Sequence, residues 1–268
     1  MNNILTSICC SALFSFLSFN IFIPFERAFS QPLYALKSAF SKSSVLGEQA
    51  KPSSKYTIIL AGDSMTQALG SGETISPTLR KYYPNKDLHI LNYGIGSTSI
   101  LTLPERLTKG AIRGNETLLP ILDKDFDLIL IESFGNNPLS NLPLEEGLKK
   151  QEEALNQSLK LIKEKKPKAV IIFVATIAPN KDRYAEGVTT LNPEQRKQWV
   201  DERVAYIKNH IKYAKDHKIS LIDLFNKSLD KYTDYINDSD FIHPSNNGLI
   251  FIGEEIANFI VSKRILLL

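Results

Sequence analysis

The sequence predicts an α/β protein in three layers, with helices on both faces of a five-stranded parallel sheet. Five short apolar runs have the length and composition of buried parallel strands. Helical stretches separate them, and strands that alternate with helices generally lie parallel in one sheet. The predicted strands cover residues 56–61, 88–92, 127–131, 169–175 and 219–223.

Three of the intervening segments carry apolar residues at the three- and four-residue steps of an amphipathic helix. One precedes the fourth strand, one lies between the fourth and fifth strands, and one is close to the C-terminus. Their apolar positions are Leu148, Leu155, Leu159 and Ile162; Val200, Val204, Ile207, Ile211 and Ala214; and Leu249, Ile252, Ile256 and Phe259. Each stripe is expected to pack on the sheet.

The first 54 residues differ in composition from the rest of the chain. Ile4 to Phe25 is an uncharged stretch of 22 residues, long enough to span a membrane. Ala28 and Ser30 have the small side chains typical of a signal-peptide cleavage site. We expect residues 1–30 to be a signal peptide or an N-terminal membrane anchor, 31–54 a linker, and 55–268 the folded domain. The protein would then be secreted or membrane-anchored, with its folded domain outside the cytoplasm.

Composition excludes several classes of protein. Of the 268 residues, 32 are Lys or Arg and 29 are Asp or Glu, and a net charge of +3 is too small to indicate a nucleic-acid partner. Both cysteines, Cys9 and Cys10, lie in the apolar N-terminal stretch. The predicted domain therefore contains no disulfide, no cysteine-ligated metal and no cysteine nucleophile.

Chemistry in a parallel sheet is expected beyond the carboxyl ends of the strands. Gly62, Asp63 and Ser64 follow the first strand, where a helix N-terminus would favour developing negative charge on the Ser64 hydroxyl. The alternative is that Asp63 or Ser64 only caps a helix. Gly94 and Gly96 follow the second strand, where they allow close backbone approach to a ligand or simply form a tight turn.

Two further segments lie near the predicted sheet edge. Asn136 and Asn137 follow the third strand, where an amide is a neutral donor for an oxyanion or a turn-forming residue. Asp240 stands three residues before His243, a spacing that allows the carboxylate to orient the imidazole as a base for a serine. The alternative is a lone surface histidine.

The other three histidines are not expected to act in the site. His210 and His217 fall on the helix before the fifth strand, where a solvated face is expected, and His89 lies within the second strand as a core or sheet residue.

The segment 177–192 adds polar length, including Lys181, Arg183, Tyr184 and Glu186, just before the single tryptophan, Trp199. It covers the site, recognises substrate, or is a solvated loop and helix start.

Four short segments, here called blocks, carry these polar residues and glycines: 62–64, 94–96, 136–137 and 240–243. Their order between Tyr56 and Val261 resembles that of the GDSL or SGNH hydrolase superfamily. The resemblance implies a flavodoxin-like fold in which Ser64 is the nucleophile, His243 the base and Asp240 its orienting partner. It also implies an oxyanion hole formed by the Ser64 N–H, the Gly96 N–H and the Asn137 side chain. Gly94 and Asn136 remain the alternatives in the last two positions.

The implied activity is that of a serine esterase or acylhydrolase, which needs no cofactor and no metal. Its substrate is expected to be a small or polymeric ester, with acyl groups on a carbohydrate or a lipid as examples. No nucleic-acid partner is expected, and residues 4–25 would attach the chain to a membrane. An O-acyltransferase on the same scaffold and a non-catalytic carbohydrate-binding protein remain as alternatives.

Overall fold

The computed structural model describes residues 54–267. The expected signal peptide or anchor, both cysteines and the linker up to residue 53 lie outside the described residues. Within 54–267, no helix is both long enough and apolar enough to cross a membrane. The first strand begins at Ser54, one residue before the expected start of the folded domain.

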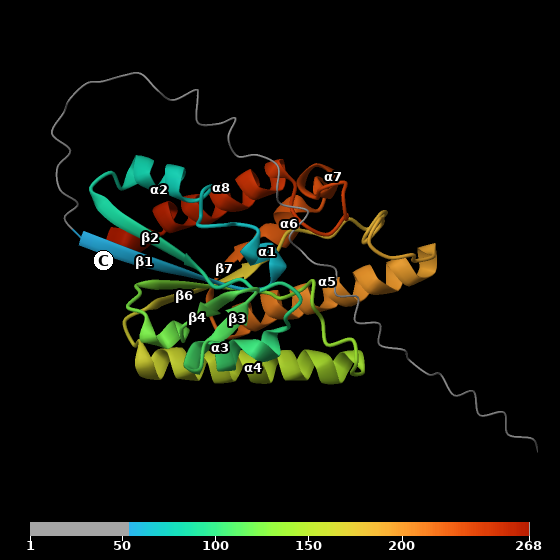
Figure 1. Cartoon of the computed structure of the whole chain (residues 1–268), viewed down its shortest axis with the longest axis horizontal. Coiled ribbons are helices and arrows are strands. Elements are labelled where there is room, and N and C mark those ends of the chain that lie inside the picture. The colour runs from blue at the N-terminus through green and yellow to red at the C-terminus, as the bar shows by residue number, and fades with distance from the viewer. Residues whose placement is uncertain (1–53, 268) are drawn as a thin grey trace, which may run out of the picture. The chain divides into compact units, whose positions relative to one another are not determined.

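The central sheet contains the five predicted strands and confirms the α/β class (Figure 1). Its strands run parallel in the order β2-β1-β5-β6-β7. Their bounds are β1 Ser54–Ala61, β2 Lys86–Asn92, β5 Leu128–Glu132, β6 Val170–Ala175 and β7 Ser220–Asp223. Each lies within two residues of its predicted position. Leu60 pairs with both Asn92 and Leu130, so β1 and its two neighbours end at the same edge.

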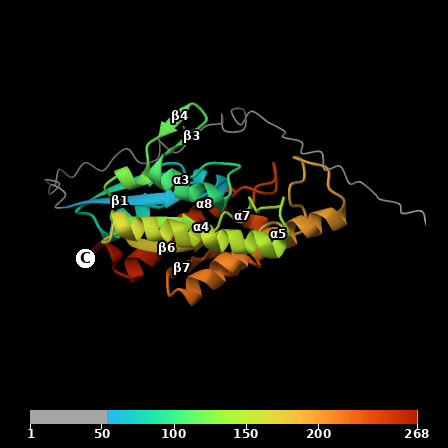
Figure 2. The same cartoon turned by 90° about the horizontal axis from the view of Figure 1, so that it is seen from below.

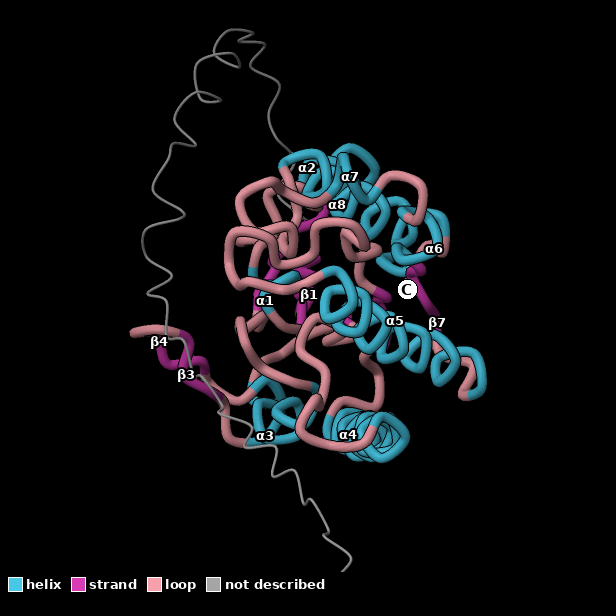
Figure 3. The backbone as a smooth tube through the Cα atoms, turned by 90° about the vertical axis from the view of Figure 1, so that its right-hand side faces the viewer, coloured by secondary structure: helices cyan, strands magenta, loops and turns pink. Residues whose placement is uncertain are grey.

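Helices cover both faces of the sheet, as Figure 3 shows with the strands between two groups of helices. One face carries α2 (Ser76–Tyr82) and α8 (Asn246–Ser262), and the other carries α3 (Leu103–Thr108), α4 (Leu144–Lys165) and α5 (Pro193–Asp216). Short helices fill the connections: α1 (Ser64–Gln67), α6 (Leu224–Ser228) and α7 (Tyr232–Tyr235). The three predicted amphipathic helices are α4, α5 and α8.

Alternate residues of β1 enter two separate cores because successive side chains of a strand point to opposite faces. Ile58 and Leu60 pack in the core that includes α8. Ile59 and Ala61 pack in the core that includes α3, α4 and α5. All four side chains are nearly inaccessible to solvent. The sheet is therefore a rigid support for the loops at its carboxyl edge.

A small antiparallel hairpin was not predicted. It consists of β3 (Ala111–Arg113) and β4 (Glu116–Leu118) and projects beside α3 in Figure 2. Three residues per strand are too few to show an alternating pattern in the sequence. The 3₁₀ helices at Ile100–Thr102, Ile121–Asp123 and Ile265–Leu267 are equally short.

The prediction for His210 was wrong. Its side chain is fully buried on α5 and stacks on Phe173 of β6, with ring centroids 4.4 Å apart. Burial lowers the pKa of His210 to about 3, so the imidazole is a neutral core side chain. His217 lies on the exposed end of the same helix, and His89 is exposed on β2. The imidazole of His210 occupies a position on the packed face of α5 where an apolar side chain is usual. The pattern of apolar residues in the sequence does not reveal that this histidine is buried.

Candidate active site

Ser64 begins helix α1 directly beyond the end of β1. Asp63 is the N-cap residue, and its carboxylate accepts a hydrogen bond of 2.8 Å from the Met65 N–H. As the first residue of the helix, Ser64 has no intrahelical acceptor for its own N–H. The capping interpretation therefore holds for Asp63, and it leaves the Ser64 N–H and hydroxyl at the sheet edge.

The carboxylate of Asp240 and the imidazole of His243 lie within ion-pair distance of each other in the loop before α8. Asp240 Oδ2 lies 2.7 Å from His243 Nδ1, while Asp240 Oδ1 accepts the N–H groups of Ile242 and His243. Burial alone would raise the pKa of Asp240, but these bonds and the nearby imidazole hold it below its ordinary value. The carboxylate consequently stays ionised and fixes the orientation of the ring.

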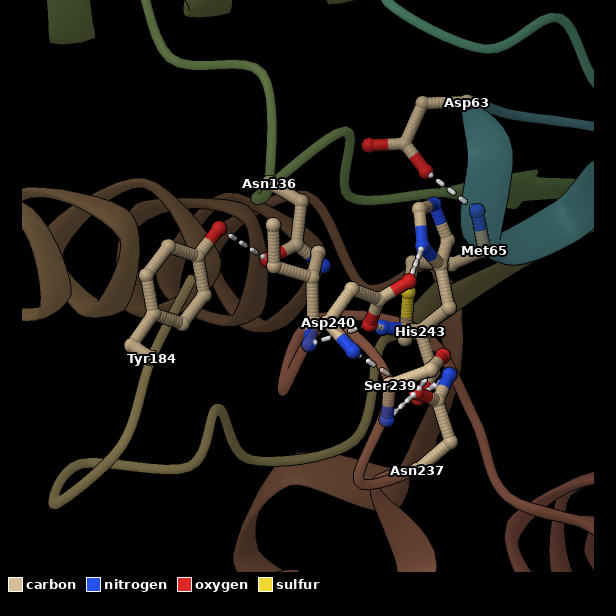
Figure 4. Close-up of polar contacts among 9 residues, drawn as sticks. Asp63, Met65, Asn136, Tyr184, Asn237, Ser239, Asp240 and His243 are labelled. Carbon is tan, nitrogen blue, oxygen red and sulfur yellow. Dashed lines mark hydrogen bonds and ion pairs between the residues drawn. The ribbon is translucent and has the colours of Figure 1, made fainter. Parts of the chain in front are cut away.

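The far edge of the His243 imidazole faces the start of helix α1. Figure 4 shows the ring between Asp240 on one side and Asp63 and Met65 on the other. The charge of His243 acts on Asp63, which directly precedes Ser64 in sequence. The structure brings together the first and last of the predicted blocks.

Gly94 and Gly96 have different surroundings. A Cβ atom at Gly94 would lie 2.3 Å from the backbone nitrogen of Gln67, so this glycine permits close packing against α1. Its N–H donates to the Asn92 side chain. A Cβ atom at Gly96 would lie 3.5 Å from the Cβ of Ser64, and the Gly96 N–H donates to Gln67 Oε1 at 2.7 Å. Of the two glycines, Gly96 therefore lies beside Ser64.

Asn136 and Asn137 also have different partners. The amide nitrogen of Asn137 donates to Asp63 Oδ2 at 2.9 Å. The carbonyl oxygen of Asn136 accepts the Tyr184 hydroxyl at 3.0 Å, and its amide nitrogen has no acceptor within residues 54–267. Phe134, two residues earlier, has a positive φ of 54°, which turns the chain sharply beyond β5. Both asparagines lie at the site. Because a side-chain NH2 group carries two hydrogens, the amide nitrogen of Asn137 keeps one hydrogen for a further acceptor in addition to the one bonded to Asp63.

A buried arginine joins the first two blocks. Arg106 of α3 donates to the carbonyl oxygens of Gly62 and Tyr93 at 2.8 and 3.2 Å, and also to the Thr98 hydroxyl. Burial lowers the pKa of Arg106 to about 10, although the charges of Asp63 and Glu132 oppose the change. At neutral pH the guanidinium remains charged and holds the two loops together. Sequence analysis missed Arg106, because nothing in its local pattern distinguishes it from a solvated helical arginine.

Two buried carboxyl groups, those of Asp63 and Glu132, lie at the start of helix α1. Glu132 ends β5, and its side chain accepts hydrogen bonds from the Ser133 hydroxyl at 2.6 Å and from the Asp63 N–H at 3.4 Å. Burial raises the pKa of Asp63 and raises the pKa of Glu132 well above its ordinary value. The sequence analysis did not predict a role for Glu132, because a polar residue at the end of a strand is common and does not indicate a buried carboxyl group. Elsewhere in the described residues, no three His, Cys, Asp or Glu side chains gather as metal ligands would.

Comparisons with known proteins bear on the family and the fold of the chain. The family model of the GDSL-like lipase/acylhydrolases matches residues 58–256. No curated protein sequence matches the chain.

Solved structures share the fold at low sequence identity. A lipase/acylhydrolase from Enterococcus faecalis is 20% identical with a TM-score of 0.55, over 78% of this chain and 96% of that one. An acetyl xylan esterase is 18% identical with a TM-score of 0.54, over 76% and 99%. A two-domain esterase active on acetylated mannans is 18% identical with a TM-score of 0.53, over 78% and 49%.

The family match and the α/β fold together define an ester-hydrolysing enzyme. Because the family model covers most of the described domain, the chain belongs to the GDSL-like lipase/acylhydrolase family.

Proposed function

We propose that the protein is a serine esterase in which Ser64 is the nucleophile, His243 the general base and Asp240 the residue that orients the base. The observation that carries the proposal is the Asp240–His243 pair, 2.7 Å apart, whose imidazole faces the residues on either side of Ser64. A serine at the start of a helix beside an oriented imidazole is the arrangement that activates a hydroxyl for acyl transfer.

The reaction proceeds in two steps. The Ser64 oxygen forms a bond to the ester carbonyl carbon while its proton passes to His243, and collapse of the tetrahedral intermediate releases the alcohol with that proton. Water then attacks the acyl-serine, His243 takes its proton, and the acid leaves as Ser64 regains its hydrogen. Asp240 stabilises the imidazolium in both steps without itself accepting the proton.

We assign the oxyanion hole to the N–H groups of Ser64 and Gly96 and to the side chain of Asn137. The Asn137 amide nitrogen donates one of its two hydrogens to Asp63, which holds the amide in place and leaves the second hydrogen for the oxyanion. Asn136 is the alternative donor, and its carbonyl oxygen accepts the Tyr184 hydroxyl. The Gly96 N–H becomes available once an oxyanion replaces Gln67 Oε1 as its acceptor. Gln67 is therefore the side chain that has to move on substrate binding.

A short acyl group on a polar alcohol is the substrate that we propose. A cavity of about 540 Å³ adjoins Gln67 and includes the polar side chains of Asn92, Arg113 and Glu116 in its lining. The structural likeness to esterases of acetylated xylan and mannan supports an acylated carbohydrate as the substrate.

We further propose that the enzyme acts outside the cytoplasm. The uncharged stretch from Ile4 to Phe25, followed by a polar segment and a cysteine-free domain, supports export or anchoring in a membrane. Cell fractionation of the full-length chain tests this proposal. Recovery with the membrane or in the extracytoplasmic fraction is expected, and a full-length protein confined to the cytosol would contradict it.

The activity is tested with the purified full-length chain and chromogenic esters of increasing acyl length. We expect turnover of acetyl esters that falls steeply for longer chains, and release of acetate from acetylated xylan or mannan. Turnover that rises with chain length would indicate a lipid substrate instead. Acetyl transfer to an added sugar in preference to water would assign the chain to acyltransferases.

A further inference from the structure

The loop that carries Asp240 and His243 is closed at its two ends. Ile236 and Pro244 form an isolated antiparallel bridge, and the N–H of Asn237 donates to the His243 carbonyl oxygen at 2.9 Å. Ile236 is buried, so the bridge is anchored in the core. Residues 237–243 therefore form a short closed loop, and the proposed base lies at its last position.

The side chain of Asn237 spans the interior of this loop. Its Oδ1 atom accepts the N–H groups of Ser239 and Asp240 at 2.9 and 3.1 Å, and the Ser239 hydroxyl at 2.7 Å. Its Nδ2 atom donates to the His243 carbonyl oxygen at 3.0 Å. In Figure 4, Asn237 lies on the opposite side of the Asp240–His243 pair from Asp63. One amide is thus bonded to the backbone of both members of the pair.

An amide is the group that these bonds require at position 237. Two backbone N–H groups face one end of the side chain and can only donate, so the atom that meets them must be the carbonyl oxygen. The other end faces the His243 carbonyl oxygen, which can only accept, so the amide nitrogen lies there. An ionised aspartate would have no hydrogen for the His243 carbonyl, and an alanine would make none of these side-chain bonds.

A strained residue between Asp240 and His243 makes the loop dependent on such support. Phe241 has a positive φ of 54°, a left-handed conformation that bulky residues rarely adopt. Its N–H donates to the Asn237 carbonyl oxygen at 3.2 Å, and its buried ring lies 3.9 Å from the Arg183 guanidinium. A residue in such a conformation persists where the surrounding contacts over-determine it. Asn237 and Arg183 both contribute contacts of this kind.

The turn at Phe241 folds the Asp240 side chain back onto the loop. Asp240 Oδ1 accepts the N–H groups of Ile242 and His243 at 2.8 and 2.9 Å, while Oδ2 lies 2.7 Å from His243 Nδ1. The Asp240 N–H and the His243 carbonyl, both bonded to Asn237, are the two ends of this arrangement. A shift of either end changes the distance between the carboxylate and the imidazole.

We propose that Asn237 is a positioning residue for the general base. Its side-chain amide holds the backbone of Asp240 and of His243 in the conformation that sets the contact between Oδ2 and Nδ1. This inference rests on the proposed function and adds to it how the base is held in place. Asn237 stands outside the four blocks and takes no part in bond making or proton transfer.

Asn237→Ala in the full-length chain tests the proposal. We expect kcat for an acetyl ester to fall about 10–100-fold with KM nearly unchanged, because the imidazole is misplaced for proton transfer. Asn209→Ala is the matched control. It removes another asparagine amide that donates to a backbone carbonyl, that of Leu148, and to Gln151 Oε1, at 3.3 and 3.0 Å, and it should leave kcat unchanged.

A spectroscopic measurement follows the contact between Asp240 and His243 directly. The proton that lies between Asp240 Oδ2 and His243 Nδ1 should give a far-downfield ¹H NMR resonance in the wild type. This resonance should be lost or shifted upfield in Asn237→Ala and retained in Asn209→Ala. A resonance that is the same in Asn237→Ala as in the wild type would overturn the inference.

A double-mutant cycle separates positioning from a general structural effect. In an Asp240→Ala background, Asn237→Ala should cause a much smaller loss of kcat than in the wild type, because the carboxylate it positions is gone. An equal loss in both backgrounds, or an unchanged kcat in Asn237→Ala alone, would overturn the inference.

Asn237→Ser replaces Asn237→Ala should the alanine variant fail to fold. A serine hydroxyl can still accept a backbone N–H of the turn, though more weakly, but it lacks the amide nitrogen that bonds to the His243 carbonyl. We expect a smaller fall in kcat than in the alanine variant, again with KM nearly unchanged. A folded Asn237→Ser protein with the kcat of the wild type would overturn the inference.

The inference and the proposed function fail in different ways. A wild-type chain without esterase activity, or with activity that survives Ser64→Ala, contradicts the proposed function. An active wild-type chain that depends on Ser64 but keeps its kcat in Asn237→Ala contradicts only the role of Asn237.

Discussion

The side-chain amide of Asn137 donates to the carboxylate of Asp63 at 2.9 Å. Asp63 in turn caps the helix that begins with Ser64. The bond joins the loop after β5 to helix α1 across 74 residues of sequence. It fixes the position of the Asn137 amide next to Ser64, whereas the side chain of its neighbour Asn136 is bonded to Tyr184.

These different partners predict different outcomes for the two alanine variants. Asn137→Ala should lower kcat by about 10²–10³-fold with little change in KM, because one oxyanion donor is lost. Asn136→Ala should mainly lower the free energy of unfolding, by about 1–3 kcal/mol, because the buried Tyr184 hydroxyl loses its acceptor. Steady-state kinetics and urea denaturation of both variants check this, and a larger kcat loss in Asn136→Ala would reverse the assignment.

The bonds made by Arg106 predict a large effect on stability. Arg106→Leu should lower the free energy of unfolding by about 3–5 kcal/mol, because it leaves three acceptors and two buried carboxyl groups without a cation. Arg113→Leu is the control. Arg113 also donates to two backbone carbonyls, Asn92 and Gly94, but it is partly exposed, so water can replace it. Equal losses of unfolding free energy in the two variants would show that the buried hydrogen bonds of Arg106 contribute no more to stability than those of the partly exposed Arg113.

Gln67 allows a test of the Gly96 N–H as an oxyanion donor. Gln67→Glu should lower kcat about 10²-fold, because a carboxylate competes for this N–H and repels the oxyanion. Gln67→Ala removes the acceptor without adding charge and should retain activity close to that of the wild type. If both variants have the same kcat, the Gly96 N–H does not contribute to catalysis.

Glu132 predicts a dependence of stability on pH. The pKa of Glu132 in the folded protein lies well above the 4.5 of an unperturbed glutamate. As the pH rises above about 4.5, the unfolded chain loses this proton first, so the wild type loses stability relative to a Glu132→Gln variant. The free energies of unfolding of the wild type and of Glu132→Gln are measured in urea at pH 4.5 and pH 8. Between these two pH values, the stability of the variant should rise relative to that of the wild type. A difference that is constant with pH would contradict the raised pKa.

The sheet and the order of the four site blocks could be predicted because each produces a short-range pattern in the sequence. Buried parallel strands are apolar on both faces, and the polar residues of the site follow directly after them, as at Ser64 and Asn136. The spacing of Asp240 and His243 places both in one short loop. These features depend on neighbouring residues only.

The remaining features depend on contacts between distant segments. Asn136 and Asn137 are chemically identical, and only their bonds to Tyr184 and Asp63 distinguish them. Arg106 becomes part of the site because α3 packs under two loops that begin far from it in sequence. His210 was misassigned for the same reason, since its burial is decided by packing against β6. Local periodicity carries no information on such pairings.

The most direct test of the central claim is the turnover of an acetyl ester by Ser64→Ala. The substitution removes one hydroxyl oxygen and should leave the unfolding transition unchanged. We predict that kcat/KM falls by about 10⁴–10⁶-fold, because the acyl-serine can no longer form. A folded Ser64→Ala protein that still turns over the ester at a rate near that of the wild type would show that Ser64 is not the nucleophile.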